Sequence, residues 1–230
     1  DINMRNIEFN NDEFYHIYNR GTDKRNIVMD ENDVERFFSA LKILNTINPV
    51  GSLYENRFRK DNEIESKDQL VEIIAYCLNR NHFHFLLKQK VDDGIVKLMQ
   101  RFGTSFTKYF NHKYKRNGVL FQGKFKAKHI NTNEYLLHLS VYINLNNLTH
   151  YSELGSQTSK LNRNSWEEYV GKSNNRICSL NTILEQFKGT QDYECFAKET
   201  LEMIRKRKYS ILELDFEDLE AGLPNLGELK

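Results

Sequence analysis

Two apolar runs that lie only three residues apart constrain this chain more than any other feature of its sequence. Residues 71–78 and 82–88 are rich in aliphatic and aromatic residues, and the polar residues 79–81 between them are typical of a turn. In the second run two histidines alternate with two phenylalanines. Because neighbouring side chains of a strand point to opposite faces, this pattern predicts a hairpin whose phenyl rings enter a core while its imidazoles share the other face.

The two histidines of this run, His82 and His84, are candidate metal ligands. Two imidazoles on one face of a strand can share a single metal ion, and the intervening phenyl ring of Phe83 would anchor the strand. A His-x-His strand is by itself a weak signal, more typical of a structural pair at the edge of a core or of simple metal binding than of a catalytic site. The pattern therefore indicates a site only if other groups converge on it.

Hydrophobic periodicity elsewhere in the chain predicts alternating strands and helices. The first strand ends at Gly21, a residue that permits a tight turn, and Asn131 and Thr132 are candidate caps of the last of these helices. Expected strands are residues 14–20, 71–78, 82–88 and 121–130, and expected helices are residues 30–47, 95–106 and 133–147. This order predicts an α+β fold, an antiparallel sheet with helices packed on it, of ferredoxin-like or RNA-recognition-motif character.

The chain changes character after residue 151. A polar linker at residues 155–164 leads to two expected helices, one capped by Ser179 and ended by Gly189, the other at residues 192–208. Since no catalytic constellation is evident there, we expect an appended helical module that packs, dimerises or contacts a nucleic acid. A polar stretch at residues 54–68 has no apolar face and is expected to be a loop.

Composition favours a folded protein of the cytoplasm. The chain has 230 residues, of which 39% are hydrophobic and 12% aromatic, enough to bury a core. No apolar stretch approaches the roughly 20 residues of a membrane span, and the first five residues do not have the form of a signal peptide. Three widely spaced cysteines form no metal-binding pattern, and we expect them to be reduced.

The formal net charge of +1 hides an uneven distribution of charge. No acidic residue lies between Asp93 and Glu134, although aromatic residues and many basic residues do. The basic residues of this block are Lys97, Arg101, Lys108, Lys113, Lys115, Arg116, Lys124, Lys126 and Lys128. Such a block can offer phosphate contacts and stacking surfaces for unpaired bases, or it can be a solvated face over an ordinary aromatic core.

Tyr142 and Asn146 lie four residues apart in an expected helix and so share one face. If that face looks onto the sheet, Asn146 can offer an oxygen to a metal held by the two histidines, and the Tyr142 phenol can reach a bound phosphate. The phenol would then act as a nucleophile on phosphorus. His138, one turn earlier, could serve as a base for the phenol, but a surface or supporting role is the expected one.

Motifs spread along the chain resemble the REP-associated tyrosine transposases, single-tyrosine transposases of the HUH endonuclease superfamily. Residues 15–21 are similar to the family's opening strand, residues 76–87 to its metal-binding hairpin, and residues 120–127 to its basic strand. Residues 142–146 resemble its catalytic helix, and residues 166–171 carry a further similarity. The chain departs from the family at Arg80 and Asn147, where the family usually has proline.

The resemblance implies a function and a set of roles. His82 and His84 match the metal ligands, Asn146 the third ligand and Tyr142 the nucleophile, with Mg²⁺ or Mn²⁺ as the cofactor. The implied activity is cleavage and rejoining of single-stranded DNA, often beside a hairpin of a palindromic repeat, through a covalent 5′-phosphotyrosine. Residues 1–150 would form the catalytic domain and residues 151–230 the linker and helical extension.

The same resemblance assigns basic residues to the DNA, with Phe121 and Phe125 expected in the core rather than stacked on bases. The expected DNA-binding residues are Arg20, Arg101, Lys108, Lys124, Lys126 and Lys128. One alternative is a non-catalytic or domesticated DNA-binding regulator on the same fold, and a weaker one is an RNA-binding domain. A homodimer and a monomer are both compatible with the sequence.

Overall fold

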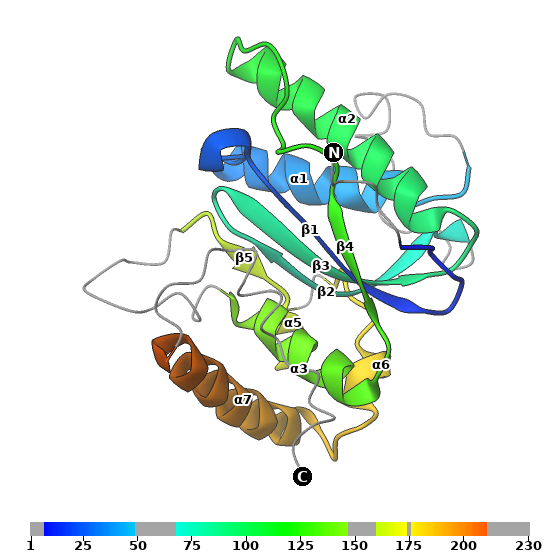
Figure 1. Cartoon of the computed structure of the whole chain (residues 1–230), viewed down its shortest axis with the longest axis vertical. Coiled ribbons are helices and arrows are strands. Elements are labelled where there is room, and N and C mark those ends of the chain that lie inside the picture. The colour runs from blue at the N-terminus through cyan, green and yellow to red at the C-terminus, as the bar shows by residue number, and fades with distance from the viewer. Residues whose placement is uncertain (1–6, 49–67, 147–159, 174–175, 211–230) are drawn as a thin grey trace.

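The computed structural model describes residues 7–48, 68–146, 160–173 and 176–210, which form a sheet covered by helices on both faces (Figure 1). In chain order the elements are β1 (Phe14–Arg20), a 3₁₀ turn η1 (Thr22–Lys24), α1 (Glu31–Leu44), β2 (Val71–Leu78), β3 (His82–Gln89), α2 (Gly94–Lys113), β4 (Lys126–Ile130), α3 (Asn133–Asn144), β5 (Arg163–Asn164), α5 (Trp166–Tyr169), α6 (Asn181–Leu184) and α7 (Thr190–Ser210).

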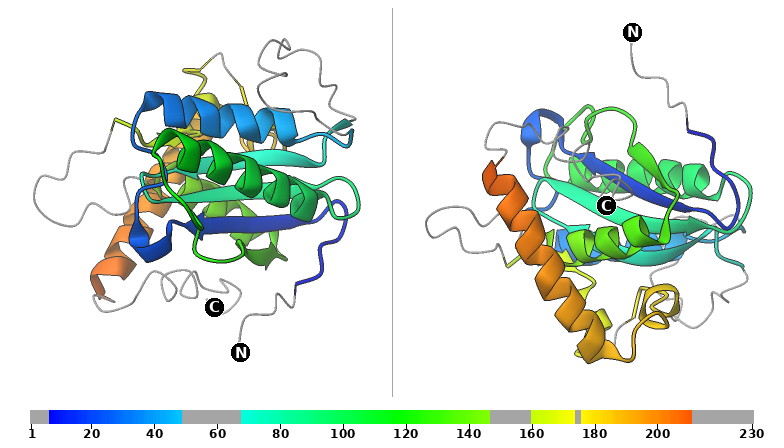
Figure 2. Two further views of the ribbon diagram at one scale, coloured as in Figure 1. Left: turned by 90° about the horizontal axis from the view of Figure 1, so that it is seen from above. Right: turned by 60° about the horizontal axis from the view of Figure 1, so that its bottom comes forward.

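The strands form one sheet in the order β4-β1-β3-β2-β5, and every pair in it is antiparallel. The first six regular elements follow the sequence strand, helix, strand, strand, helix, strand, and their strand order 4-1-3-2 is that of a ferredoxin-like fold. Helices α1 and α2 cover one face, whereas α3 and α7 lie on the other side of the sheet (Figures 1 and 2). The predicted α+β class is therefore confirmed.

The alternation of β3 divides its side chains between these two layers as the sequence predicts. Phe83 and Phe85 are buried against Phe37 of α1, with ring centroids 5.7 and 6.0 Å from it, and Phe83 also meets Phe102 of α2. His84, on the opposite face, is fully buried and meets the ring of Tyr142 on α3. The aromatic core thus fixes which way the histidines point.

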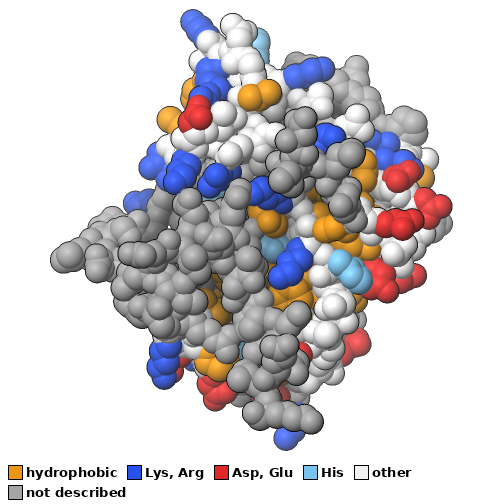
Figure 3. Space-filling view, in the orientation of Figure 1, with side chains coloured by type: hydrophobic (Ala, Val, Ile, Leu, Met, Phe, Trp, Pro, Cys, Tyr) orange, Lys and Arg blue, Asp and Glu red, His pale blue; other side chains and the backbone are white. Residues whose placement is uncertain are grey.

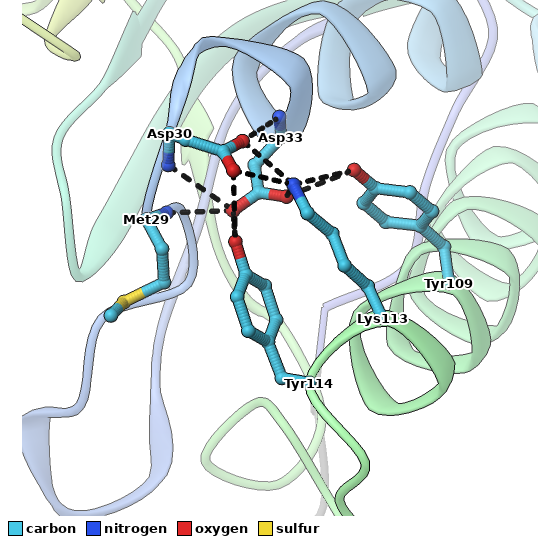
Figure 4. A network of polar contacts seen from close by, with 6 residues as sticks. All are labelled: Met29, Asp30, Asp33, Tyr109, Lys113 and Tyr114. Carbon is cyan, nitrogen blue, oxygen red and sulfur yellow. Dashed lines mark hydrogen bonds and ion pairs between the residues drawn. The ribbon is translucent and has the colours of Figure 1, made fainter.

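A polar network joins the start of α1 to the end of α2 (Figure 4). Asp30 caps α1 in a reciprocal capping box with Asp33, whose side chain is completely buried. The Lys113 ammonium donates to Asp33 Oδ1 at 2.6 Å and to Asp30 Oδ1 at 2.7 Å, while the hydroxyls of Tyr109 and Tyr114 also donate to Asp33. These bonds tie the two helices of the layer together.

The C-terminal elements join the same core. The short strand β5 pairs with the edge of β2, and Tyr169 and Tyr193 are fully buried in the cluster that contains the sheet residues. The Tyr193 hydroxyl from α7 lies 3.1 Å from Ser140 Oγ and accepts a hydrogen bond from Asn144 Nδ2 at 2.9 Å. Helix α7 therefore holds the buried polar side of α3.

Some predicted bounds differ from the structure. The expected strand at residues 121–130 is regular only over β4, because the backbone turns at Gly123 with φ +67° and Phe121 forms just an isolated bridge to Gly21. Ser179 does not cap a helix: its N–H is bonded to Ile73 O, and the short α6 begins two residues later. Helix α1 begins after Asp30 and ends at Leu44, and α3 begins after its Thr132 cap and ends at Asn144.

Gly21 is needed for space rather than for an unusual backbone angle. Its φ of −64° is open to any residue, but a Cβ there would lie 2.1 Å from the carbonyl oxygen of Arg25. The close approach lets the chain turn sharply after β1, where Gly21 N–H also bonds to Asn81 O at 2.8 Å. This turn and the β2–β3 hairpin turn therefore lie side by side.

Three other expectations can be compared with the structure. Cys77, Cys178 and Cys195 are free thiols, the first two buried and the third exposed. In the described parts of the chain, none of the helices combines the length and apolar character that a membrane span requires. The expected loop at residues 54–68 and the expected domain boundary near residue 150 lie almost entirely outside the described residues.

Candidate active site

Strand β3 and helix α3 bring the main candidate residues together at one place. The ring centroids of His84 and Tyr142 are 5.7 Å apart with the rings nearly perpendicular, and those of His82 and His84 are 5.2 Å apart. Tyr142 is 5% exposed, whereas His84 and Asn146 are fully buried. Residues separated by about sixty positions in the sequence thus share one small polar region between the sheet and α3.

The orientation of His84 is set by a histidine on the neighbouring strand. His16 Nε2 lies 3.0 Å from His84 Nδ1, and burial, reinforced by the charge of Lys128, lowers the pKa of His16 to about 3. His16 is therefore neutral near pH 7, and its Nε2 can accept a hydrogen bond from the Nδ1–H of His84. In that arrangement the lone pair of His84 Nε2 is available to a cation.

The orientation of His82 is set by an asparagine of the hairpin turn. Asn81 Oδ1, which can only accept, lies 2.7 Å from His82 Nδ1, so the proton of the neutral ring belongs on Nδ1. The Nε2 atom of His82 is then an acceptor. It receives a hydrogen bond from the Asn79 amide, whose Nδ2 lies 2.8 Å away. The accepting oxygen of Asn81 thus fixes the tautomer of His82 that presents Nε2 as a ligand, and the contact with His16 is compatible with the same tautomer of His84.

Asn146 is connected to the same group of side chains. Asn79 Nδ2 also donates to Asn146 Oδ1 at 2.7 Å, so one amide nitrogen links the candidate ligand atoms of His82 and Asn146. Sequence reasoning did not assign a role to Asn79, Asn81 or His16. The two asparagines were interpreted as turn residues, and the only available signal for them was their position beside His82.

The donor set suits the expected divalent ion. Two imidazole nitrogens and one amide oxygen form a mixed set compatible with Mn²⁺ or Mg²⁺ and also with Zn²⁺. Among the described residues no group of three or more His, Cys, Asp and Glu side chains is arranged to hold a metal. The role of Asn146 as third ligand stays a prediction. Asn81 and His16 would be the supporting groups that fix the ligands.

Part of the expected DNA-binding set lies on the same face as this site. In the registers of the sheet, Tyr18 is paired with both His84 and Lys126, and His16 is paired with Lys128. Because directly opposite residues share a face, Lys126 and Lys128 project on the side of Tyr142. Arg20, two residues beyond Tyr18, belongs to that face too and donates from Nε to Gln122 Oε1.

The other expected DNA-binding residues lie elsewhere. Lys108 of α2 and Lys124 line a cavity of about 710 Å³ between α2 and residues 119–125, on the opposite face of the sheet. Phe121 and Phe125 form part of its wall. Arg101 donates to Thr46 O at 2.6 Å and so joins α2 to the end of α1. The expected set is therefore divided between two faces, and its contact with DNA stays a prediction.

Charge is distributed unevenly over the surface. Figure 3 shows Lys and Arg side chains gathered over the half of the molecule that contains α2 and the segment after it, whereas Asp and Glu lie mainly along other edges. Among the described residues that line the cavity containing Lys108 and Lys124, none is acidic. This surface can attract a polyanion although the net charge of the chain is only +1.

His138 is expected to support Tyr142, but its ring contacts another helix. Its ring packs against Phe196 of α7, with centroids 5.4 Å apart, so it contacts the C-terminal helix. Phe121 and Phe125, both expected in the core, are partly buried and pack against it, and the ring of Phe121 meets those of Phe83, Phe102 and Phe106. A role for His138 beside Tyr142 stays a prediction.

The fold and site define an α+β protein with a histidine pair on a central strand and a tyrosine on the facing helix. Residues 52–146 match the model of the family "Transposase IS200 like", a segment that contains His82, His84, Tyr142 and Asn146 and is less than half of the chain. The resemblance to tyrosine transposases expected from the motifs is confirmed over this segment. This segment is therefore transposase-like in sequence.

One solved structure with a similar chain is described as "Structure of the REP associates tyrosine transposase bound to a REP hairpin". The two chains are 14% identical and superimpose with a TM-score of 0.48, over 76% of this chain and 90% of that chain. No curated protein sequence is detectably similar to this chain.

Proposed function

We propose that this protein is a metal-dependent tyrosine endonuclease and strand transferase that cleaves and rejoins single-stranded DNA. One observation carries the proposal: Tyr142 lies edge-on to His84, while His82 and Asn146 are joined through Asn79 in the same buried region. The transposase-like segment at residues 52–146 supports DNA as the substrate. The motif resemblance further favours hairpin or palindromic repeat elements.

The chemistry assigned to Tyr142 is a transfer of the 5′-phosphate. The phenolic oxygen attacks phosphorus, the new P–O bond to Tyr142 forms, and the P–O3′ bond breaks so that a 3′-hydroxyl leaves. The DNA is then attached to the protein through a 5′-phosphotyrosine. Because this linkage retains the energy of the phosphodiester, a 3′-hydroxyl can attack it and rejoin strands without ATP.

The residues of the chain would bind and orient the reacting groups. His82, His84 and Asn146 would hold a divalent ion, which supplies charge neutralisation at the scissile phosphate when bound. The buried faces of β3 and α3 place the Tyr142 ring at a fixed distance from the histidines, which favours a defined line of attack. The Tyr142 proton must be removed during attack, and His138 is the candidate that the sequence provides for this step.

The DNA strand would approach along β4. Lys126 and Lys128 project on the Tyr142 face of this edge strand, and Arg20 lies on the neighbouring strand β1. Their charges would hold the phosphates on either side of the scissile bond. Lys108 and Lys124 line the cavity on the opposite face of the sheet. They would contact DNA that continues past the edge strand β4. Sequence preference would depend on groups other than these lysines.

The experiment is a search for the covalent intermediate. A labelled hairpin library with single-stranded flanks is incubated with the protein and Mn²⁺, and a denaturant-stable adduct is measured for wild type and for Tyr142→Phe. Tyr135→Phe is the matched control, since Tyr135 lies on the same helix two turns earlier and should keep the adduct.

Loss of the adduct in Tyr142→Phe alone would support the proposal. Tight hairpin binding by wild type with no adduct from the library would favour the regulator instead, because a binder requires the basic residues and not the phenolic hydroxyl. An adduct that persists in Tyr142→Phe would assign the nucleophile to another residue.

A further inference from the structure

The side chain of Asn79 has contacts that its position in a hairpin turn does not require. Its backbone N–H already donates to His82 O at 2.9 Å and so closes the turn. Its side chain is nevertheless directed into the polar region beside α3, where Asn79 is only 7% exposed. There the single nitrogen Nδ2 lies 2.8 Å from His82 Nε2 and 2.7 Å from Asn146 Oδ1.

These two acceptors are the atoms that a divalent ion would require. Ligand nitrogen and oxygen atoms lie about 2.0–2.2 Å from Mg²⁺ or a similar ion, so an ion shared by His82 Nε2 and Asn146 Oδ1 would lie between them. An amide nitrogen within 2.8 Å of both acceptors uses the same lone pairs and much of the same space. The amide hydrogens and a cation are therefore alternative partners of the two atoms.

We propose that Asn79 competes with the divalent ion for His82 and Asn146 and thereby sets the metal affinity of the site. This inference rests on the proposed function, since it concerns the metal site of the endonuclease. Loading the ion requires the Asn79 side chain to release two hydrogen bonds and move aside. The Asn79 amide and the ion therefore compete for the same two acceptor atoms. Asn79 is a positioning residue for the ligands and does not contact the DNA.

Asn81 provides a matched comparison on the same imidazole ring. Asn81 Oδ1 contacts Nδ1 of His82 at 2.7 Å and keeps the proton on that nitrogen, which leaves Nε2 ready for a metal. Removal of the Asn81 side chain should weaken metal binding, because outer groups that orient ligands typically contribute about 10–100-fold in affinity. Removal of the Asn79 side chain should strengthen it. Removal of the two asparagine side chains, which contact opposite nitrogens of one ring, should therefore change the metal affinity in opposite directions.

The experiment is a calorimetric titration of the full chain with Mn²⁺ without DNA, supported by the electron paramagnetic resonance signal of free Mn²⁺. We expect Asn79→Ala to bind Mn²⁺ about tenfold more tightly than wild type, the equivalent of one to two ordinary hydrogen bonds. Asn81→Ala should bind at least tenfold more weakly. Asn79→Asp keeps the shape of the side chain, cannot donate to the two acceptors when ionised, and should also bind more tightly.

The outcomes distinguish a failure of the Asn79 proposal from a failure of the proposed metal site. If His84→Ala abolishes Mn²⁺ binding but both Asn79 variants leave it unchanged or weaken it, the proposed competition is wrong. The proposed endonuclease function is then unaffected. Wild-type protein that binds no Mn²⁺ at millimolar concentration overturns the competition together with the metal site. Thermal unfolding of each variant shows that it is folded, and the backbone bond of Asn79 that closes the turn is preserved in both substitutions.

Discussion

Replacement of Lys113 by methionine tests whether the polar network between α1 and α2 holds the helical layer together. The substitution keeps a long unbranched side chain but removes the ammonium that donates to Asp33 and Asp30. Asp33 is completely buried, so its carboxylate would lose its only described cationic partner within 4 Å. Removal of one partner of a buried ion pair typically costs about 3–5 kcal/mol.

The structure places this cost near the lower end of that range. Asp33 would keep hydrogen bonds from the Tyr109 and Tyr114 hydroxyls and from the N–H of Met29, which stabilise its charge. Asp30 is about half exposed and can be hydrated. We therefore expect Lys113→Met to lower the free energy of unfolding by about 3 kcal/mol and the melting temperature by about 6–12 °C.

Urea denaturation followed by circular dichroism measures this change. The matched control is Lys198→Met, which breaks the exposed pair with Glu194 on α7 and should leave stability unchanged within error. A loss for Lys113→Met no greater than that of Lys198→Met would refute the reasoning, because the buried carboxylate would then not depend on the lysine.

The difference in free energy of unfolding between wild type and Lys113→Met should also depend on pH, and this dependence is a second test of the network. Hydrogen bonding from Lys113 lowers the pKa of Asp30, so its contribution is present above the ordinary carboxyl pKa and is lost as pH falls. Burial alone would lower the pKa of Lys113, but hydrogen bonds to Asp30 and Asp33 outweigh it and raise this pKa, so its contribution is lost at high pH. The difference between wild type and Lys113→Met should therefore be constant between about pH 5 and pH 9.

Two further predictions concern the other layer and the DNA. Tyr193→Phe removes the hydroxyl that contacts Asn144 and Ser140, and because a buried donor on α3 is left unsatisfied we expect a loss of about 1–3 kcal/mol in urea denaturation. The same loss in a variant that removes an exposed tyrosine hydroxyl would argue against this reasoning. Lys126→Ala should weaken hairpin binding and reduce the salt slope of log K by about one, as expected for one lost phosphate contact, and an unchanged slope would exclude that contact.

The local features of the fold were predictable from the sequence. Alternation in residues 82–88 placed Phe83 and His84 on opposite faces, and helical periodicity identified α1, α2 and α3. These predictions succeed because strand and helix periods of two and 3.6 residues are properties of the backbone itself. The bounds were less predictable: β4 is shorter than expected because the chain turns at Gly123 before it.

The sequence by itself indicated the candidate groups of the site, namely His82, His84, Tyr142 and Asn146, and spacing along one strand placed the two histidines on one face. The expected helix face shared by Tyr142 and Asn146 is not formed, because α3 ends at Asn144 and Asn146 lies beyond its C-cap Leu145. Only the tertiary structure decided which groups surround the candidate groups. His16 comes from another strand, and Asn79 and Asn81 come from a turn whose side chains no periodicity orients. The basic residues show the same limit, since Lys126 and Lys108 belong to one charged block but lie on opposite faces of the sheet. Contacts between distant segments depend on how the sheet and helices pack, and that information is distributed over the whole chain.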